Sequence, residues 1–192
     1  MKVISQLQPP PKRLDQFLDP VDTRAPVFTP RSGPAGTAVT VEIKDLPAVT
    51  PVYLGMGATR SSFEVLSRFV TDQNGEMSQV VEIPSWAMSD RTHFFVLVDV
   101  YFRPLAISEA FHVTEQDGTL VRKGRITTDE SGSCLTMREE GESQELYALL
   151  GDTHGLKPGE DVVVEGTLTE FSDCTEGSAI QLTGIEPLNI ER

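Results

Sequence analysis

Two cysteines and three histidines are the side chains with the most specific chemistry in this 192-residue chain. Cys134 and Cys174 are the only cysteines, and two thiols can close a disulfide, stay reduced or share a metal. A zinc site takes four ligands, and two cysteines without nearby histidines fall short of that number. We therefore expect no metal site, and either a disulfide or two reduced thiols.

The histidines are His93, His112 and His154, and the sequence places none of them beside an identifiable nucleophile. His112 stands between two apolar residues of a strand-like run, so alternation predicts that its side chain points outward. The chain has no Gly-x-Ser-x-Gly, His-Glu-x-x-His, Gly-x-Gly-x-x-Gly or phosphate-loop motif. Asp72 to Glu76 resembles only part of a calcium loop, and a hairpin turn explains Asn74 and Gly75. The sequence predicts a protein that is not an enzyme and needs no cofactor.

Charge excludes further classes of function. Sixteen Lys and Arg residues against 29 Asp and Glu residues give a net charge of -13. Residues 117 to 192 hold 16 acidic and 6 basic side chains, a net charge of -10. Such a surface repels a phosphate backbone, so we expect no nucleic-acid partner. Asp99 ends the longest apolar run, Phe94 to Val98, far below the roughly 18 residues of a membrane span.

Residues 1 to 24 have the composition of an extended, proline-rich arm. Pro9 to Pro11 favour polyproline II, while Leu14, Phe17 and Leu18 fall at the spacing of one helical turn and could dock on a partner. The segment lacks the continuous apolar region of a signal peptide. The protein would be cytoplasmic or particle-associated if residue 1 is the native start, and in the cell envelope if a signal peptide was removed.

From residue 25 to 116 the pattern changes to short strands with almost no helix. Val39, Val41 and Ile43 alternate with polar residues, which is typical of a half-buried strand. Asn74 and Gly75 tolerate the positive φ of a hairpin turn. About seven such strands, with turn signals roughly every 8 to 12 residues, predict a β-sandwich.

Four segments of this region carry a resemblance to a known family: Pro30 to Val41, Thr71 to Gly75, Ile83 to Ala87 and Ala110 to Thr114. In order and spacing they resemble bacterial immunoglobulin-like domains of the IPT/TIG type. The resemblance implies a spacer or interaction module without shared catalytic residues. Trp86 could anchor a partner, although the analogous position in such domains is usually packed against the sandwich edge.

Residues 117 to 192 contain five further strand candidates. These are Leu120 to Thr128, Cys134 to Arg138, Glu145 to Leu150, Val162 to Glu170, and Ala179 to Ile185. Five strands with the one longer connection between the third and the fourth match the order of an OB-fold. Within that connection and the next strand, Gly155 to Gly166 resembles small bacterial OB-fold domains in which a short helical turn feeds a Gly-x-x-Val-x-Val-x-Gly strand.

This strand order puts Cys134 and Cys174 in two loops that flank one binding face. A disulfide there is geometrically sensible, and it would imply an oxidising compartment, whereas the missing signal peptide implies a reducing one. Single-strand binding through such a face needs a basic groove and stacking aromatics. Residues 117 to 192 offer only Tyr147 and Phe171 for stacking, with a basic cluster limited to Arg122, Lys123 and Arg125.

The sequence thus predicts an all-β protein with an extended arm (1–24), an immunoglobulin-like sandwich (25–116) and an acidic OB-like barrel (117–192). The expected role is a non-catalytic structural or adaptor subunit of a larger protein assembly, such as a phage-like or secretion particle. Its partners would be other protein subunits. The alternative is a cell-envelope module that binds a glycan or peptide through the OB face. The sequence identifies neither the partner nor the ligand.

Overall fold

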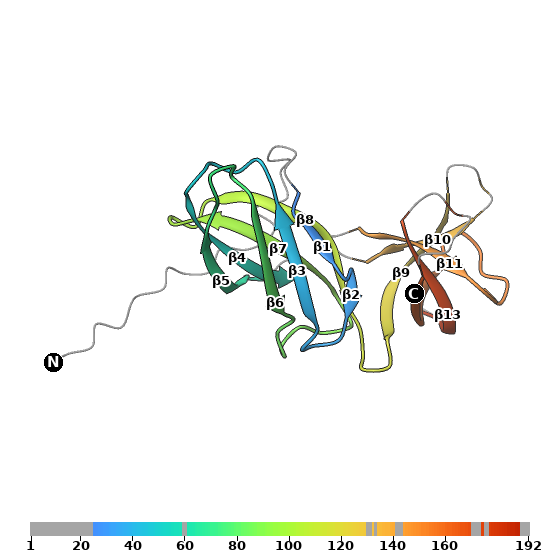
Figure 1. Ribbon diagram of the computed structural model, residues 1–192. Coiled ribbons are helices and arrows are strands. Elements are labelled where there is room, and N and C mark those ends of the chain that lie inside the picture. Colours follow the sequence, from blue (N-terminus) through green and yellow to red (C-terminus); the bar gives the residue numbers. More distant parts are fainter. Residues whose placement is uncertain are drawn as a thin grey trace. The chain divides into compact units, whose positions relative to one another are not determined.

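A computed structural model describes residues 25–58, 61–129, 132, 134–140, 144–169, 174 and 177–188. The arm predicted for residues 1 to 24 lies outside these residues. The described chain is all-β, an immunoglobulin-like sandwich followed by an OB-like barrel (Figure 1). No described segment is a helix with the length and apolar character needed to cross a membrane.

The sandwich consists of two sheets. The smaller sheet has the order β1 (Val27–Thr29), β3 (Ala38–Ile43), β6 (Met77–Glu82). The larger sheet has the order β2 (Ser32–Gly33), β8 (Pro104–Val113), β7 (Thr92–Asp99), β4 (Pro51–Ala58), β5 (Glu64–Val70). Strand β3 is half-buried as predicted, with Val39, Val41 and Ile43 inward, whereas every residue of β7 is buried.

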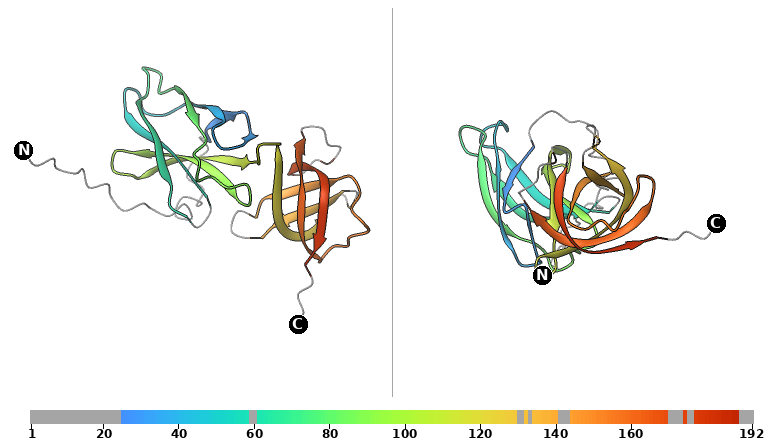
Figure 2. Two further views of the ribbon diagram at one scale, coloured as in Figure 1. Left: turned by 90° about the horizontal axis from the view of Figure 1, so that it is seen from below. Right: turned by 90° about the vertical axis from the view of Figure 1, so that its right-hand side faces the viewer.

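The barrel closes from five strands in the order β10 (Leu135–Glu139), β11 (Leu146–Leu150), β13 (Ser178–Pro187), β12 (Asp161–Thr169), β9 (Thr119–Thr128). Strand β11 runs parallel to β13 and the other pairs are antiparallel. This is the strand order predicted from the sequence, and it is that of an OB-fold. Figure 2 shows these strands, coloured yellow to red, wound around one interior.

Strand β9 holds the barrel closed because it pairs with β12 along its first part and with β10 along its second. Gly124 lies at the changeover, opposite both Val162 and Glu139. A side chain at this position would collide with the carbonyl oxygen of Arg138. The strand can therefore bend between its two partners only because residue 124 is glycine.

The interior of the barrel is apolar over most of its length. Its core consists of Leu120, Ile126, Met137, Tyr147, Leu149, Val162, Val164 and Ile180. The connection between β11 and β12 differs from the short helical turn that the family resemblance implied. It forms two turns, at His154–Gly155 and Pro158–Gly159, and both glycines have the positive φ that such turns favour.

The chain groups into two compact units. One includes Glu42–Ser78 and Phe94–Glu109, and the other includes Phe28–Val41, Gln79–His93 and the chain from Ala110 onward. The predicted boundary at residues 116 and 117 falls in the turn between β8 and β9. That boundary remains a prediction, and the two candidate sites below each lie within one unit.

Candidate functional site

The hairpin that joins β7 to β8 ends in an exposed turn with a fixed backbone. Its carboxylate, Asp99, accepts hydrogen bonds at Oδ1 from the backbone N–H groups of Tyr101 (2.8 Å) and Arg103 (2.9 Å). Oδ2 accepts a third from Nε of Arg103 at 2.6 Å. Burial raises the pKa of the Asp99 carboxyl, but the hydrogen bonds from Arg103 and Tyr101 outweigh it and keep the pKa below its ordinary value.

Aromatic rings and guanidinium groups cover this turn. The ring of Phe102 stacks on that of Tyr53 with centroids 5.3 Å apart, and its backbone has a φ of 59°. Arg68 lies over the Tyr53 ring at 5.6 Å, and Arg103 lies over the Tyr101 ring at 5.3 Å. We call these five residues, Tyr53, Arg68, Tyr101, Phe102 and Arg103, the aromatic tip.

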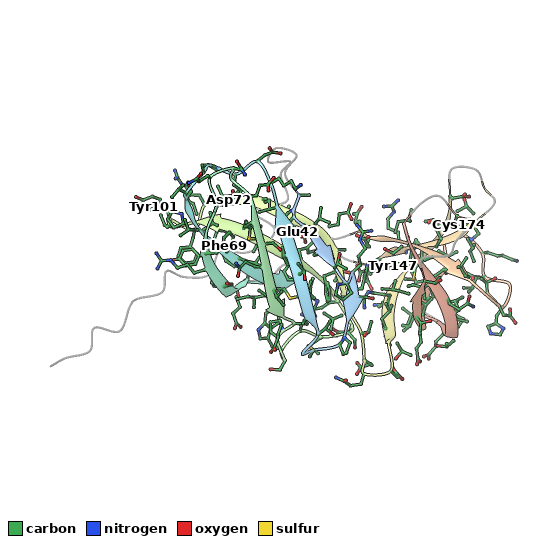
Figure 3. All side chains as sticks on the ribbon, in the orientation of Figure 1. Glu42, Phe69, Asp72, Tyr101, Tyr147 and Cys174 are labelled. Carbon is green, nitrogen blue, oxygen red and sulfur yellow. A yellow bond between two sulfur atoms is a disulfide. The ribbon has the colours of Figure 1, made fainter. Side chains whose placement is uncertain are left out.

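The aromatic tip presents apolar surface to solvent. Tyr101 is 74% exposed and its neighbour Val100 is 38% exposed. Figure 3 shows Tyr101 at the outer end of the β7–β8 hairpin. Tyrosine and arginine are the residue types that most often dominate protein interfaces, and fixed rings lose little entropy on binding. The tip is therefore equipped to bind a partner.

A second candidate site is a buried polar cluster at the barrel. It consists of Thr92, His112, Arg122, Glu139 and Tyr147, all within the second unit. Nε of Arg122 donates to the Tyr147 hydroxyl at 3.1 Å and lies 3.5 Å from Oε1 of Glu139. The Thr92 hydroxyl donates to Oε2 of Glu139 at 2.8 Å. The Arg122 Nη1 also donates to the carbonyl oxygens of Ser89 and Val121.

Burial keeps two titratable members of this cluster, His112 and Tyr147, neutral near pH 7, whereas Arg122 and Glu139 form an ion pair. Desolvation, with a smaller contribution from the Arg122 charge, lowers the pKa of His112 from 6.5 to about 3. Desolvation also raises the pKa of Tyr147 to about 12. His112 lies 3.4 Å from the Tyr147 hydroxyl through Nδ1 and 3.2 Å from the Ser178 hydroxyl through Nε2. A base with so low a pKa, closed off from solvent, is unsuited to proton transfer near neutral pH.

Cys134 and Cys174, the predicted pair, form a disulfide. Their sulfur atoms are 2.07 Å apart and their Cα atoms 5.9 Å apart, within the reach that the predicted strand order required. Both half-cystines belong to the barrel, and the bond closes a sequence separation of 40 residues. Among the residues that the structure describes, no group of three or more side chains is arranged to hold a metal ion.

Removing the disulfide is expected to destabilise the barrel. A closed loop of this length lowers the chain entropy of the unfolded state by an amount worth about 4 kcal/mol. The double variant Cys134→Ser/Cys174→Ser should lose free energy of unfolding of that order in urea denaturation without reductant. Reductant should shift the wild-type midpoint toward that of the variant and leave the variant unchanged. Equal midpoints for oxidised wild type and variant would contradict the prediction.

The other predicted partner-binding residues have different outcomes. Trp86 is 37% exposed, and the centroid of its ring lies 5.9 Å from that of His93. Its side chain is therefore partly packed against the protein and partly accessible to solvent. Leu14, Phe17 and Leu18 lie outside the described residues. Arg122, which sequence analysis grouped with Lys123 and Arg125 as a basic cluster, is completely buried and belongs to the polar cluster instead.

Sequence reasoning missed the aromatic tip, although a signal was present. Residues 99 to 103 read Asp-Val-Tyr-Phe-Arg, and they connect two strands without glycine or asparagine. Apolar and aromatic residues in a hairpin turn are exposed by position, so this run of residues predicts an exposed aromatic surface at the turn. The buried arginine also had a signal, because Leu120, Arg122, Gly124 and Ile126 share one face by strand alternation.

Neither a protein-family model nor a curated protein matches the sequence. Among solved structures, macromomycin is similar over 48% of this chain and 100% of its own length, with 15% sequence identity and a TM-score of 0.40. A similarity this weak supports no inference about activity or partners. The resemblances to IPT/TIG-type domains and to small bacterial OB-fold domains therefore stay predictions.

Proposed function

We propose that this protein is a non-catalytic structural or adaptor subunit of a larger protein assembly, and that it binds another subunit through the aromatic tip. The observation that carries the proposal is Tyr101, an aromatic side chain 74% exposed on a turn whose backbone is fixed by Asp99. A partner that covers a large ring on a rigid turn removes apolar surface from water, which favours binding.

The composition of the tip supports a protein partner. Truncation of tyrosine and arginine at the centre of interfaces has the largest effects on protein affinity. The stack of Phe102 on Tyr53 and the Arg103 contact to Asp99 hold these side chains before a partner arrives, so little ordering entropy is lost on binding. A turn whose side chains are preorganised in this way is suited to a stable contact with another subunit.

The polar cluster supports the absence of catalysis. Its imidazole and phenol are neutral near pH 7, and its members are buried in the described structure. A general base needs a pKa near the working pH and access to a substrate, and His112 has neither. The cluster is better explained as a device that fixes the fold of the second unit.

Photo-crosslinking at the tip tests the proposal. The full chain would carry Val100→p-benzoylphenylalanine and be produced in the cells that naturally make it. We expect one adduct of defined mass, and we expect Tyr101→Ala or Arg68→Ala to abolish it. The matched control places the same crosslinker at Lys157, an exposed turn residue of the barrel, and should give no adduct.

Two further variants separate the possible docking surfaces. The crosslinker at Trp86 reports on that partly exposed ring, and deletion of residues 1 to 24 reports on the arm. An adduct that survives Tyr101→Ala, or that forms only from Trp86, would refute docking through the tip. If deletion of residues 1 to 24 abolishes the adduct formed from position 100, the arm would be the segment that binds the partner.

The disulfide favours a second candidate function, a cell-envelope module that binds a glycan or peptide through the OB face. Disulfides persist in oxidising compartments, and this one joins the two predicted loops that flank that face. A glycan array probed with the oxidised full chain tests this candidate. Binding that reductant abolishes and that Tyr101→Ala leaves intact would favour it over the adaptor role.

We predict that the protein does not bind single-stranded DNA or RNA at physiological salt. With Arg122 buried, the basic cluster is reduced to Lys123 and Arg125, and these pair with Glu140 (2.6 Å) and Asp161 (2.8 Å). Tyr147 is buried and cannot stack on a base. Fluorescence anisotropy with labelled oligonucleotides at about 150 mM salt should show no saturation in the low micromolar range. Tight, salt-sensitive binding would contradict the prediction.

A further inference from the structure

The two arginines of the aromatic tip differ in their electrostatic environment. Arg103 is paired with Asp99 through Nε at 2.6 Å. Arg68 is exposed, lies over the Tyr53 ring, and has no ion pair with any residue that the structure describes. In a chain with a net charge of -13, carboxylates are abundant, so an arginine held on a ring without one of them is available to an outside anion.

The ring contact prepares Arg68 for a planar anion. Arg68 and Tyr53 are cross-strand partners of β5 and β4, so the guanidinium is held beside the rest of the tip by the register of the sheet. A guanidinium that lies over a ring keeps its planar set of N–H donors available to an anion. That geometry matches the two oxygens of a carboxylate, which can accept two parallel hydrogen bonds.

We propose that the partner protein places an Asp or Glu carboxylate on Arg68 and an aliphatic or aromatic side chain on Tyr101. This inference rests on the proposed function and specifies its chemistry. Two cations, one of them already paired, are enough for a single carboxylate. They are too few for an anionic membrane or a nucleic acid, each of which is bound through several positive charges at once. The ring of Tyr53 is covered by Phe102 and Arg68, which disfavours stacking of a sugar there.

A random dodecapeptide library displayed on phage is the probe. The immobilised full chain should enrich peptides that carry Asp or Glu next to an aliphatic or aromatic residue. Synthetic copies of these peptides should bind at least about tenfold more weakly to Arg68→Ala and to Tyr101→Ala. The first change removes a charged hydrogen bond to the peptide, and the second removes a ring that the peptide would cover. Arg68→Lys keeps the charge but loses the planar fork, so it should also weaken binding.

Arg125→Ala is the matched control. Arg125 is an exposed arginine of the barrel with an ion pair to Asp161, and its replacement should leave peptide affinity unchanged. Urea denaturation of each variant confirms that it is folded before binding is measured. A second control replaces the acidic residue of the enriched peptide by Asn or Gln. This change should weaken binding to the wild type by about tenfold or more and have little effect on binding to Arg68→Ala.

Other outcomes overturn the inference. Enriched peptides without an acidic residue, or peptides insensitive to Arg68→Ala, would remove the carboxylate contact, and so would a library that yields no tip-dependent binder. Tip-dependent binding to vesicles of phosphatidylcholine and phosphatidylserine would assign a membrane instead, and concentration-dependent dimerisation lost in Arg68→Ala would assign a second copy of this chain. If crosslinking from Val100 still depends on Tyr101 while the library fails, the adaptor role stands and only its proposed chemistry falls.

Discussion

Replacing Arg122 by methionine is expected to lower the free energy of unfolding by about 3 to 5 kcal/mol. The Arg122 side chain is completely inaccessible to solvent, and it pairs with a Glu139 side chain that is only 7% exposed. Methionine fills a similar volume but carries no charge. Its introduction removes the positive charge that lies 3.5 Å from the buried Glu139 carboxylate, which costs far more than the loss of one hydrogen bond.

Urea denaturation of Arg122→Met and Arg125→Met provides the measurement and its control. Both residues are arginines of β9 with a carboxylate partner, but the Arg125 side chain is 63% exposed and points to solvent. An exposed pair contributes much less than a buried one, because water and salt screen its charges, so Arg125→Met should lose little stability. If both variants lose the same small amount, the buried ion pair is not a major determinant of stability.

The double variant Arg122→Met/Glu139→Leu distinguishes the loss of the ion pair itself from the cost of keeping the Glu139 carboxylate buried without Arg122. Removing both charges also removes the buried carboxylate that Arg122→Met deprives of its arginine, so the double variant should recover much of the stability that Arg122→Met loses. Nη2 of Arg122 has no hydrogen-bond partner among the described residues, so the arginine itself is not fully satisfied. The native cluster is therefore not optimal for stability alone, and an apolar replacement of both residues has room to succeed.

The sequence was sufficient to predict the strands because alternation and turn chemistry are local signals. Leu120 to Thr128 was predicted as one strand, and β9 covers Thr119–Thr128. The barrel order followed from the length of one connection, which is a property of the chain. The cysteine pairing followed in turn, because this order brings two loops far apart in sequence to one end of the barrel.

The burial of His112 could not be predicted in the same way, and the expectation that it points outward was wrong. Alternation assigns a strand residue to one of two faces, but it does not say whether the second face meets solvent. His112 is 4% exposed because Tyr147 and Ser178, both remote in sequence, cover its ring. Only the tertiary structure brings these residues together.

The ring contact in the aromatic tip could not be predicted from the sequence for a different reason, which is an unusual backbone angle. Tyr53 and Phe102 are far apart in sequence, and a backbone φ of 59° at Phe102 brings their rings together. No propensity scale favours a positive φ at phenylalanine, so the contact between these two rings could not be predicted from the sequence pattern. Positive φ at a bulky residue is tolerated where surrounding bonds enforce it, here the three hydrogen bonds to Asp99.

Acidification from pH 7 to pH 4 is expected to destabilise the protein through His93 and His112. Burial is the main cause that lowers the pKa of His93 to about 4 and that of His112 to about 3, from an ordinary value of 6.5. The charge of Arg122 acts in the same direction on both residues, and Arg31 adds to it at His112. Both side chains are therefore neutral in the folded protein, while the unfolded chain takes up protons as the pH falls through 6.5.

The sign follows from this difference, because the unfolded state binds more protons and stability falls with falling pH. Each histidine contributes on the order of 3 kcal/mol over this range, at about 1.4 kcal/mol per pKa unit. Two such contributions approach the whole stability of a typical domain. The paired carboxyls of Asp99 and Asp161 have lowered pKa values and lose their contribution only below about pH 4, so they do not account for a change in stability between pH 6.5 and 4.

Urea denaturation at several pH values checks this expectation. His112→Gln should lose stability at pH 7, because it disturbs the contacts to Tyr147 and Ser178, but its stability should fall less steeply between pH 6.5 and 4. His154→Gln is the matched control, because it replaces an exposed histidine instead of a buried one. A wild-type stability that stays constant from pH 7 to 4 would mean that both imidazoles are protonated in the folded state. Burial would then not keep them neutral, and Nδ1 of His112 would donate a hydrogen bond to the Tyr147 hydroxyl instead of accepting one.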